Sequence, residues 1–311
     1  MAQALQHNEQ PNHRAALTRF AWLSIAAALV TITLKTTAYL LTGSVGLLSD
    51  AAESIVNLVG AIMALGMLII AARPADKTHS YGHSKAEYFS SGVEGILILV
   101  AAAAITWSSI ERLLSPRPLE QLGLGLVVSV VASLVNFGVA RVLLNAGKRE
   151  NSITLEADAQ HLMTDVWTSL GVIGGLGLVA LTGWTSLDAV VAIIVALNII
   201  WTGLQLLRRS VAGLMDAALP LPDQQRIEAV MALYRGKQVD FHALRTRRAA
   251  SRRFVTVHML VPGAWTVHDA HLFAEGFESD VRTALGEAVI TTHVEPIEDE
   301  LSMKDILLEQ E

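Results

Sequence analysis

The sequence predicts an integral membrane protein, in which an all-α bundle of six transmembrane helices precedes a small α+β domain. Composition is the first observation behind this prediction: 52% of the 311 residues are hydrophobic and 17% are charged, whereas roughly a quarter are charged in a typical soluble domain. Mean hydropathy is +0.45. The second observation is distribution, because residues 20–207 hold the apolar surplus while residues 221–311 have the composition of a water-soluble segment.

Six stretches are long and apolar enough to cross the hydrocarbon core of a bilayer, which takes about 20 residues. They lie at 18–42, 46–72, 86–113, 120–146, 154–182 and 185–208. Tight turns separate them on one side of the membrane, at 42–44, 115–118 and 182–184. The connections on the other side are predicted to be longer and polar, at 73–85 and 147–153.

Positive charge predicts the orientation of these spans, because cytoplasmic loops carry an excess of Lys and Arg. One side has Arg14, Arg19, Arg73, Lys77, Lys85, Lys148, Arg149, Arg208 and Arg209. The opposite side has only Arg112 and Arg117 in its connections. We therefore expect a multi-pass protein of the inner (plasma) membrane with both termini in the cytoplasm. The first two predicted segments of the chain are a disordered N-terminus at 1–17 and a transmembrane domain at 18–210.

The segment after the last span changes periodicity and is predicted to be a separate cytoplasmic domain at 211–299, followed by a C-terminal tail at 300–311. Its expected elements are an amphipathic helix, two alternating strands, a second helix and a third strand, at 222–235, 239–248, 253–261, 267–285 and 288–295. The order αββαβ favours a sheet with its helices on one face. Pro220 and Pro222 mark the junction with the membrane part.

Polar residues inside the spans are the first indication of function, because ionisable groups in hydrocarbon are costly and usually functional. Glu53 and Asn57 lie four residues apart in the second span, and so do His161 and Asp165 in the fifth. Each pair therefore shares one face of its helix. We expect the two faces to meet near the middle of the membrane and to form a four-coordinate metal site.

The charges of this set fit a divalent cation, because Glu53 and Asp165 supply two negative charges and the other two ligands are neutral. Ligands of these types bind either a metal ion or protons, which gives a physical basis for exchanging one for the other. A competing interpretation is that the polar groups only join helices by hydrogen bonds. Asp50, three residues before Glu53, could be a further ligand, a gate or an acid of the outer vestibule.

The chain contains no cysteine, so any metal must be held by His, Asp, Glu or Asn. The first cytoplasmic loop offers Asp76, His79 and His83, which are either metal ligands or surface residues without that role. The cytoplasmic domain offers His242, His258, His293 and Glu295 on its predicted strands, with His271 on the second helix less certain. His293 and Glu295 share one face of their strand, which favours a metal site over solvated histidines.

These features in this order resemble the cation diffusion facilitator family over nearly the whole chain. The resemblance rests on GSVGLLSDAAESIVN at 43–57, PADKTHSYGHSKAE at 74–87, ADAQHLMTD at 157–165, LMDAALP at 214–220 and the histidine-bearing tail. It implies a homodimeric antiporter of Zn²⁺, Cd²⁺, Fe²⁺, Co²⁺ or Mn²⁺ with a ferredoxin-like cytoplasmic domain. It also implies that Lys85 and Asp216 form a charge pair that holds the dimer together.

The resemblance implies the same ligands that the spacing suggests: Glu53, Asn57, His161 and Asp165 for transport, with a loop site and a tail site beside them. One departure concerns selectivity. Zinc-selective members usually have Asp or His at the position of Glu53 and Asp at that of Asn57, so this chain has a longer carboxylate and a neutral amide. Such a set also suits Fe²⁺, Co²⁺ or Mn²⁺, although zinc is the first expectation.

The sequence therefore predicts a secondary active transporter that exchanges metal for protons by alternating access. The alternatives are a channel-type carrier whose polar groups form a water path, and a membrane metal sensor through which nothing passes. The chain shows no HExxH, GxSxG or phosphate-loop motif, so an enzyme is not expected. A net charge of −6 argues against a nucleic-acid partner, and the expected partners are metal ions, protons, the lipid bilayer and a second copy of the chain.

Overall fold

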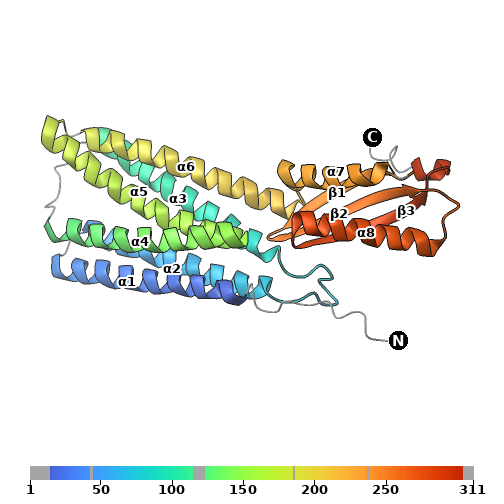
Figure 1. The fold of residues 1–311 in the computed structure, drawn as a ribbon. Helices are drawn as coiled ribbons and strands as arrows, with labels where there is room; N and C mark the ends of the chain where they lie inside the picture. The colour runs from blue at the N-terminus through green and yellow to red at the C-terminus, as the bar shows by residue number, and fades with distance from the viewer. Residues whose placement is uncertain (1–14, 43–44, 115–122, 185, 237, 304–311) are drawn as a thin grey trace. The chain divides into compact units, whose positions relative to one another are not determined.

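A computed structural model describes residues 15–42, 45–114, 123–184, 186–236 and 238–303. The chain divides into two compact units, the first ending at Val211 and the second beginning at Ala212. Figure 1 shows that the first unit is helical and that the second contains a sheet and two long helices.

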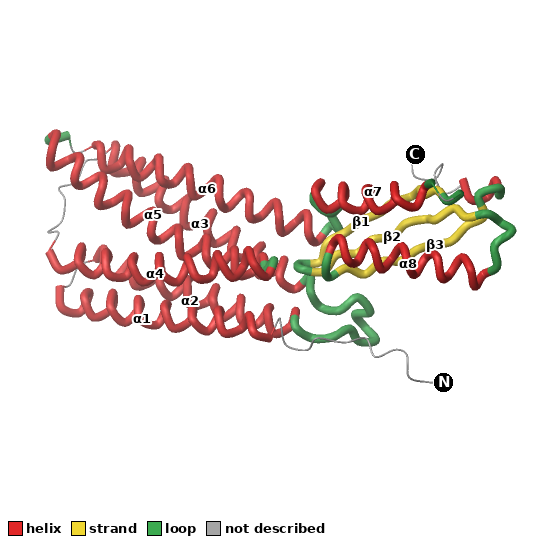
Figure 2. The backbone as a smooth tube through the Cα atoms, viewed as in Figure 1, coloured by secondary structure: helices red, strands yellow, loops and turns green. Residues whose placement is uncertain are grey.

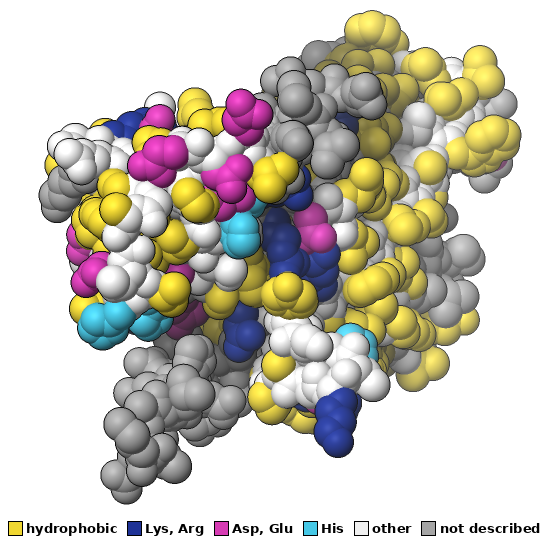
Figure 3. All heavy atoms as spheres, turned by 90° about the vertical axis from the view of Figure 1, so that its right-hand side faces the viewer, with side chains coloured by type: hydrophobic (Ala, Val, Ile, Leu, Met, Phe, Trp, Pro, Cys, Tyr) yellow, Lys and Arg dark blue, Asp and Glu magenta, His cyan; other side chains and the backbone are white. Residues whose placement is uncertain are grey.

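The first unit consists of six long helices that follow one another along the chain. They are α1 Thr18–Thr42, α2 Val45–Ala71, α3 Ala86–Leu114, α4 Gly123–Glu150, α5 Ile153–Thr182 and α6 Ser186–Leu214. Within the described ranges, six helices are long and apolar enough to cross a membrane. Large hydrophobic side chains such as Trp107, Leu181 and Trp201 are exposed on this unit. Figure 3 shows one part of the surface that is covered mostly by hydrophobic side chains, drawn in yellow. The six-helix bundle is thus confirmed.

The connection predicted at 147–153 is wrong, because α4 continues to Glu150 and only Asn151 and Ser152 separate it from α5. Asn151 adopts a positive φ of 52°, and the Ser152 hydroxyl caps α5 by accepting from the backbone N–H of Leu155. Gly147 lets the helices approach closely, since a Cβ there would lie 2.9 Å from the Glu156 backbone nitrogen. The charged residues that suggested a loop are therefore the last turn of a helix.

Two predicted terminal boundaries also shift. Residues Ala15–Leu17 form a 3-10 turn before α1, and Leu17 is buried in a cluster with Ala21 and Leu65, so the disordered segment expected at 1–17 does not cover this turn. At the other end, Glu300–Met303 form a second 3-10 turn, in which the Ser302 hydroxyl donates to the Pro296 carbonyl. The rest of both predicted tails lies outside the described residues.

The second unit has the predicted order αββαβ. Its elements are α7 Leu221–Arg235, β1 Asp240–Ala249, β2 Arg252–Val261, α8 Val267–Leu285 and β3 Ala288–Pro296. The strands form one sheet in the order β1-β2-β3, with β1 antiparallel and β3 parallel to the central strand. Figure 2 shows these strands running beside α7 and α8.

The core of this unit lies between the sheet and the two helices. Ile227 of α7, Phe277 of α8 and Val257 and Met259 of β2 are all fully buried in one cluster. Because side chains alternate along a strand, His258 must point to the face of β2 opposite this cluster. The packing of α7 and α8 on one face therefore leaves the other face for histidines.

Tyr234 of α7 contacts α8 through both its ring and its hydroxyl group. Its ring packs edge-on against Phe273 and Phe277, and its hydroxyl donates to Asp280 over 2.7 Å. Burial, followed by the hydrogen bond to the Asp280 carboxylate, raises the pKa of Tyr234 from 10.0 to about 12. The neutral phenol is therefore the form that the folded domain favours.

This shift predicts how the domain responds to alkali. Tyr234 is the single tyrosine of residues 212–311, so ultraviolet titration of that fragment should show one phenol ionising near 12 in the folded state. Because the folded pKa is raised, its contribution to stability is complete below pH 10 and disappears as the pH approaches 12. Asp280→Asn should lower this pKa and the exposed Glu275→Gln should not. Ionisation of folded wild type near 10 would contradict the assignment.

Candidate metal centres

Three of the four predicted transmembrane ligands, Asn57 on α2 and His161 and Asp165 on α5, lie in direct contact. The Asn57 side-chain amide donates to Asp165 Oδ2 over 2.5 Å, and His161 Nε2 lies 2.6 Å from Asn57 Oδ1. All three side chains are at most 7% exposed. Glu53, one turn earlier on α2, is half-buried. Asp50 is on the same helix, but its side chain lies outside the described residues, so the gate remains a prediction.

Two further residues complete this buried group, and the sequence analysis missed both. Asn136 of α4 donates to Asp165 Oδ2 over 2.8 Å, and Glu94 of α3 places its Oε2 3.0 Å from His161 Nδ1. Each is 2% exposed. A carboxylate in an apolar span was the available signal for Glu94. Four helices, α2 to α5, therefore contribute to one connected polar group.

A second buried acid belongs to α5 as well. Asp158 is 2% exposed, and its Oδ1 accepts a hydrogen bond from the Ser24 hydroxyl of α1 at 3.0 Å. Its other oxygen has no hydrogen-bond partner among the described residues. Asp158 precedes His161 by three residues, so it lies on nearly the same face of the helix. The candidate transport group thus has an acid about one turn away.

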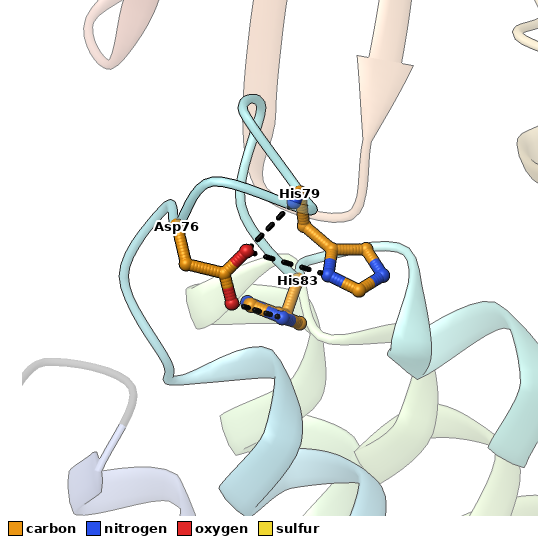
Figure 4. Close-up of side chains that lie close together, drawn as sticks. All are labelled: Asp76, His79 and His83. Atoms are coloured by element: carbon orange, nitrogen blue, oxygen red, sulfur yellow. Dashed lines mark hydrogen bonds and ion pairs between the residues drawn. The ribbon is translucent and has the colours of Figure 1, made fainter.

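The loop residues Asp76, His79 and His83 also lie together, as Figure 4 shows. Asp76 Oδ1 accepts from the backbone N–H groups of Thr78 and His79, over 2.8 and 2.7 Å, in a compact turn. Gly82 with a φ of 81° lets the chain reverse before His83. The two imidazole rings are 4.5 Å apart between centroids.

The hydrogen bonds of this loop leave Asp76 Oδ2 and His83 Nε2 available to bind a cation. The Thr78 hydroxyl, with the backbone donors, lowers the pKa of Asp76, so this carboxylate is anionic at neutral pH. His83 Nδ1 lies 3.2 Å from the Pro74 carbonyl and donates to it. That places the lone pair on Nε2, which faces Asp76 Oδ2 at 3.4 Å. Two acceptors at this distance repel each other unless a proton or a metal ion lies between them.

The cytoplasmic sheet brings three histidines into one row. His242 pairs with His258 across β1 and β2, and His258 pairs with His293 across β2 and β3. Glu295 lies beside the row, with its Oε2 2.8 Å from His242 Nε2 and 3.4 Å from His258 Nδ1. Its Oε1 is 3.4 Å from His293 Nε2. One carboxylate therefore contacts all three imidazoles.

Two ring nitrogens in this row have no hydrogen-bond partner among the described residues, which favours a metal site. The Nδ1 atoms of His242 and His258 are buried without a hydrogen-bond partner among the described residues, although buried polar atoms are nearly always paired. His242, His258 and Glu295 can each offer one atom to a common ion. His293 is 63% exposed at the margin. His271 is exposed on α8, a helix that packs on the opposite face of the sheet, so it does not join this group.

The predicted charge pair of Lys85 and Asp216 remains a prediction. In the second unit, Asp216 accepts from Arg247 of β1 over 3.1 Å, a partner that the sequence analysis missed. Asp216 has a positive φ of 57°, a conformation that Asp adopts more readily than most residues. Arg247 also stacks on the Phe254 ring at 4.2 Å.

Comparison with known proteins identifies both units. Residues 21–215 match the family model of the cation efflux transmembrane domain, and residues 219–297 match that of the cation efflux protein cytoplasmic domain. An uncharacterized transporter of Synechocystis sp. is 52% identical over 280 residues, 90% of each chain. The cation-efflux pump FieF of Shewanella oneidensis is 31% identical over 277 residues, 89% of this chain and 93% of the pump.

A solved structure, the metal-bound C-terminal domain of the CzcD transporter from Thermotoga maritima, is similar to a part of this chain. It is 28% identical, and the match covers 26% of this chain and 93% of that domain with a TM-score of 0.24.

The histidine row yields a prediction about metal binding. Glu295→Ala removes the carboxylate that contacts all three imidazoles, and we expect zinc binding by the 212–311 fragment to weaken by at least about ten-fold. Calorimetric titration measures the affinity, and Glu300→Ala, which removes an exposed acid of the same region, is the matched control. Equal affinity of the Glu295→Ala and wild-type fragments would remove this residue from the site.

Proposed function

Because this chain belongs to the cation diffusion facilitator family, we propose that it exports a divalent transition metal, with zinc as the first candidate, in exchange for protons. Membership rests on the two cation efflux family models, which together match residues 21–215 and 219–297. The chain is a divalent cation efflux transporter and a multi-pass inner-membrane protein. The identity of the metal and its exchange for protons are what we propose beyond this.

The observation that carries this proposal is the contact between His161, Asn57 and Asp165 inside the helical unit. Their polar atoms lie 2.5 to 2.6 Å apart, on two helices that are otherwise apolar enough to cross a membrane. An imidazole, an amide oxygen and a carboxylate on facing helices are ligands that a divalent ion accepts. Glu53, one turn before Asn57, would add the fourth.

The ligand types support zinc without requiring it. Zinc prefers four ligands that include imidazole and carboxylate, and Glu53, Asn57, His161 and Asp165 provide these types. Oxygen ligands with a single imidazole are also acceptable to Fe²⁺, Co²⁺ or Mn²⁺, and Cd²⁺ belongs to the set implied by the family. Asn57 in place of an acid removes one negative charge from the site.

Exchange follows from the chemistry of the same ligands. Imidazole and carboxylate bind a metal when deprotonated and release it when protons replace it. We propose that helix movements expose the group to the cytoplasm and to the outside in turn, so that the proton gradient drives metal export. His161 and Asp165 would hold protons on the return step.

The remaining candidate sites fit regulation better than transport, because they lie outside the six spans. We propose that the histidine row of the sheet binds metal in a homodimer and favours the transport-competent arrangement of the membrane part. Such a coupling requires two distinct sites with a shared conformational equilibrium. The loop group of Asp76, His79 and His83 would bind metal at the cytoplasmic side, and Lys85 and Asp216 would hold the dimer.

Removing the carboxylate of Asp165 tests the transport proposal. Metal-dependent proton flux is measured in proteoliposomes for the wild type and Asp165→Ala, with Zn²⁺, Cd²⁺, Fe²⁺, Co²⁺ and Mn²⁺. Saturable flux with one or two of these ions should fall to background in the variant, since a required ligand and its negative charge are lost. Thr164→Ala is the matched control, because among the described residues the side chain of this buried neighbour bonds only its own helix, at the Gln160 carbonyl.

Two other outcomes would favour the alternatives. Flux that is equal in the wild type and Asp165→Ala would indicate a channel-type carrier. Absence of flux with every metal, combined with tight metal binding by the 212–311 fragment, would indicate a membrane metal sensor.

A further inference from the structure

Glu94 is a buried acid of the transmembrane group that is not among its four proposed metal ligands. It lies on α3 and is 2% exposed. Its Oε2 is 3.0 Å from His161 Nδ1 on α5. Its Oε1 occupies the space beside Gly60 of α2, where a Cβ would lie 2.6 Å from that oxygen. The carboxylate is therefore held between the imidazole and the backbone of the helix that carries Asn57.

The surrounding hydrogen bonds define which ring nitrogen of His161 faces the ligands. Asn57 donates its amide N–H to Asp165, so its Oδ1 is an acceptor. His161 Nε2 lies 2.6 Å from this Oδ1 and must donate to it. A neutral imidazole carries a single ring proton, so a ring that binds a metal through Nε2 must carry that proton on Nδ1. Nδ1 is the atom that faces Glu94.

The contact acts through charge more than through hydrogen-bond geometry. The two atoms are at ion-pair distance, but they are not aligned as a regular hydrogen bond. A negative charge beside Nδ1 still favours a proton there, because the attraction depends mainly on distance. Metal-binding histidines commonly have a carboxylate at their second nitrogen, where it sets the tautomer and the ring orientation.

A role in helix packing alone does not account for this arrangement. A buried carboxylate in an apolar span is costly, and packing is better served by an apolar side chain of similar volume. The missing Cβ of Gly60 makes room for one oxygen, while the other faces the imidazole. Asn57 is neutral where an acid would add charge, and Glu94 brings a carboxylate to the opposite side of the same imidazole.

We propose that Glu94 is a positioning residue of the transport site, which holds His161 with its proton on Nδ1 so that Nε2 binds the metal. The inference rests on the proposed transport function and deepens it. Glu94 acts through His161 and supplies negative charge close to the bound cation.

Two variants test this role by different means. Glu94→Gln keeps the shape and removes the charge, whereas Gly60→Ala keeps the charge and displaces the carboxylate. Both should raise the KM for zinc flux in proteoliposomes by about 10- to 100-fold, the usual effect of losing such a partner of a metal-binding histidine. The maximal rate per inserted protein should change much less. Ser91→Ala is the control, because this buried α3 residue contacts Ser210 instead and its KM should equal that of the wild type.

The outcomes separate the two proposals. An unchanged KM in both variants, with losses only in folded yield, thermal stability or maximal rate, would overturn the role of Glu94 while leaving transport intact. A wild type without metal flux, or Asp165→Ala with full flux, would overturn the transport proposal and the role of Glu94 with it. A raised KM in both variants, with Ser91→Ala unaffected, is the expected result.

Discussion

Hydrocarbon offers no hydrogen-bond partners, so a polar side chain inside a helix bundle must find its partner within the protein. In this chain one connected group meets that constraint. Asp165 accepts from Asn57 and Asn136, Asn57 contacts His161, and His161 faces Glu94. The members come from α2, α3, α4 and α5, so the group joins four helices through polar contacts. Three members of this group, Asn57, His161 and Asp165, are also proposed metal ligands.

The three candidate metal groups are built by different local structures, which suits them to different roles. The residues of the buried group project from the faces of neighbouring helices. The loop group is positioned by a turn whose backbone N–H groups donate to the Asp76 carboxylate. The histidine row is positioned by the pairing of three strands. The loop group is largely exposed, whereas Glu295 in the sheet is only 11% exposed. Exposure favours rapid exchange of an ion with solvent, and burial among satisfied neighbours favours selective binding. The buried group alone lies in helices that can cross a membrane.

The sequence was sufficient wherever the deciding pattern was local. Hydropathy placed the six spans, and strand alternation placed His258 and Glu295 on the free face of the sheet. It was insufficient where partners came from other elements. The i, i+4 spacing pairs His161 with Asp165, and Glu94 stands out as a carboxylate in an apolar span. The contacts of Glu94 with His161 and of Asn136 with Asp165 join different helices, so no pattern within one helix predicts them. Charged residues at 148–150 also suggested a loop, although α4 continues through them to Glu150.

The central claim is that the buried group binds the metal, and zinc-edge X-ray absorption of the full chain tests it most directly. Asp76→Ala and Glu295→Ala combined would weaken zinc binding by the loop and sheet groups and leave the transmembrane ligands intact. The account predicts that this variant retains zinc with one histidine nitrogen and oxygen ligands at about 2.0–2.2 Å. A variant that retains no zinc, or whose spectrum lacks the histidine contribution, would contradict it.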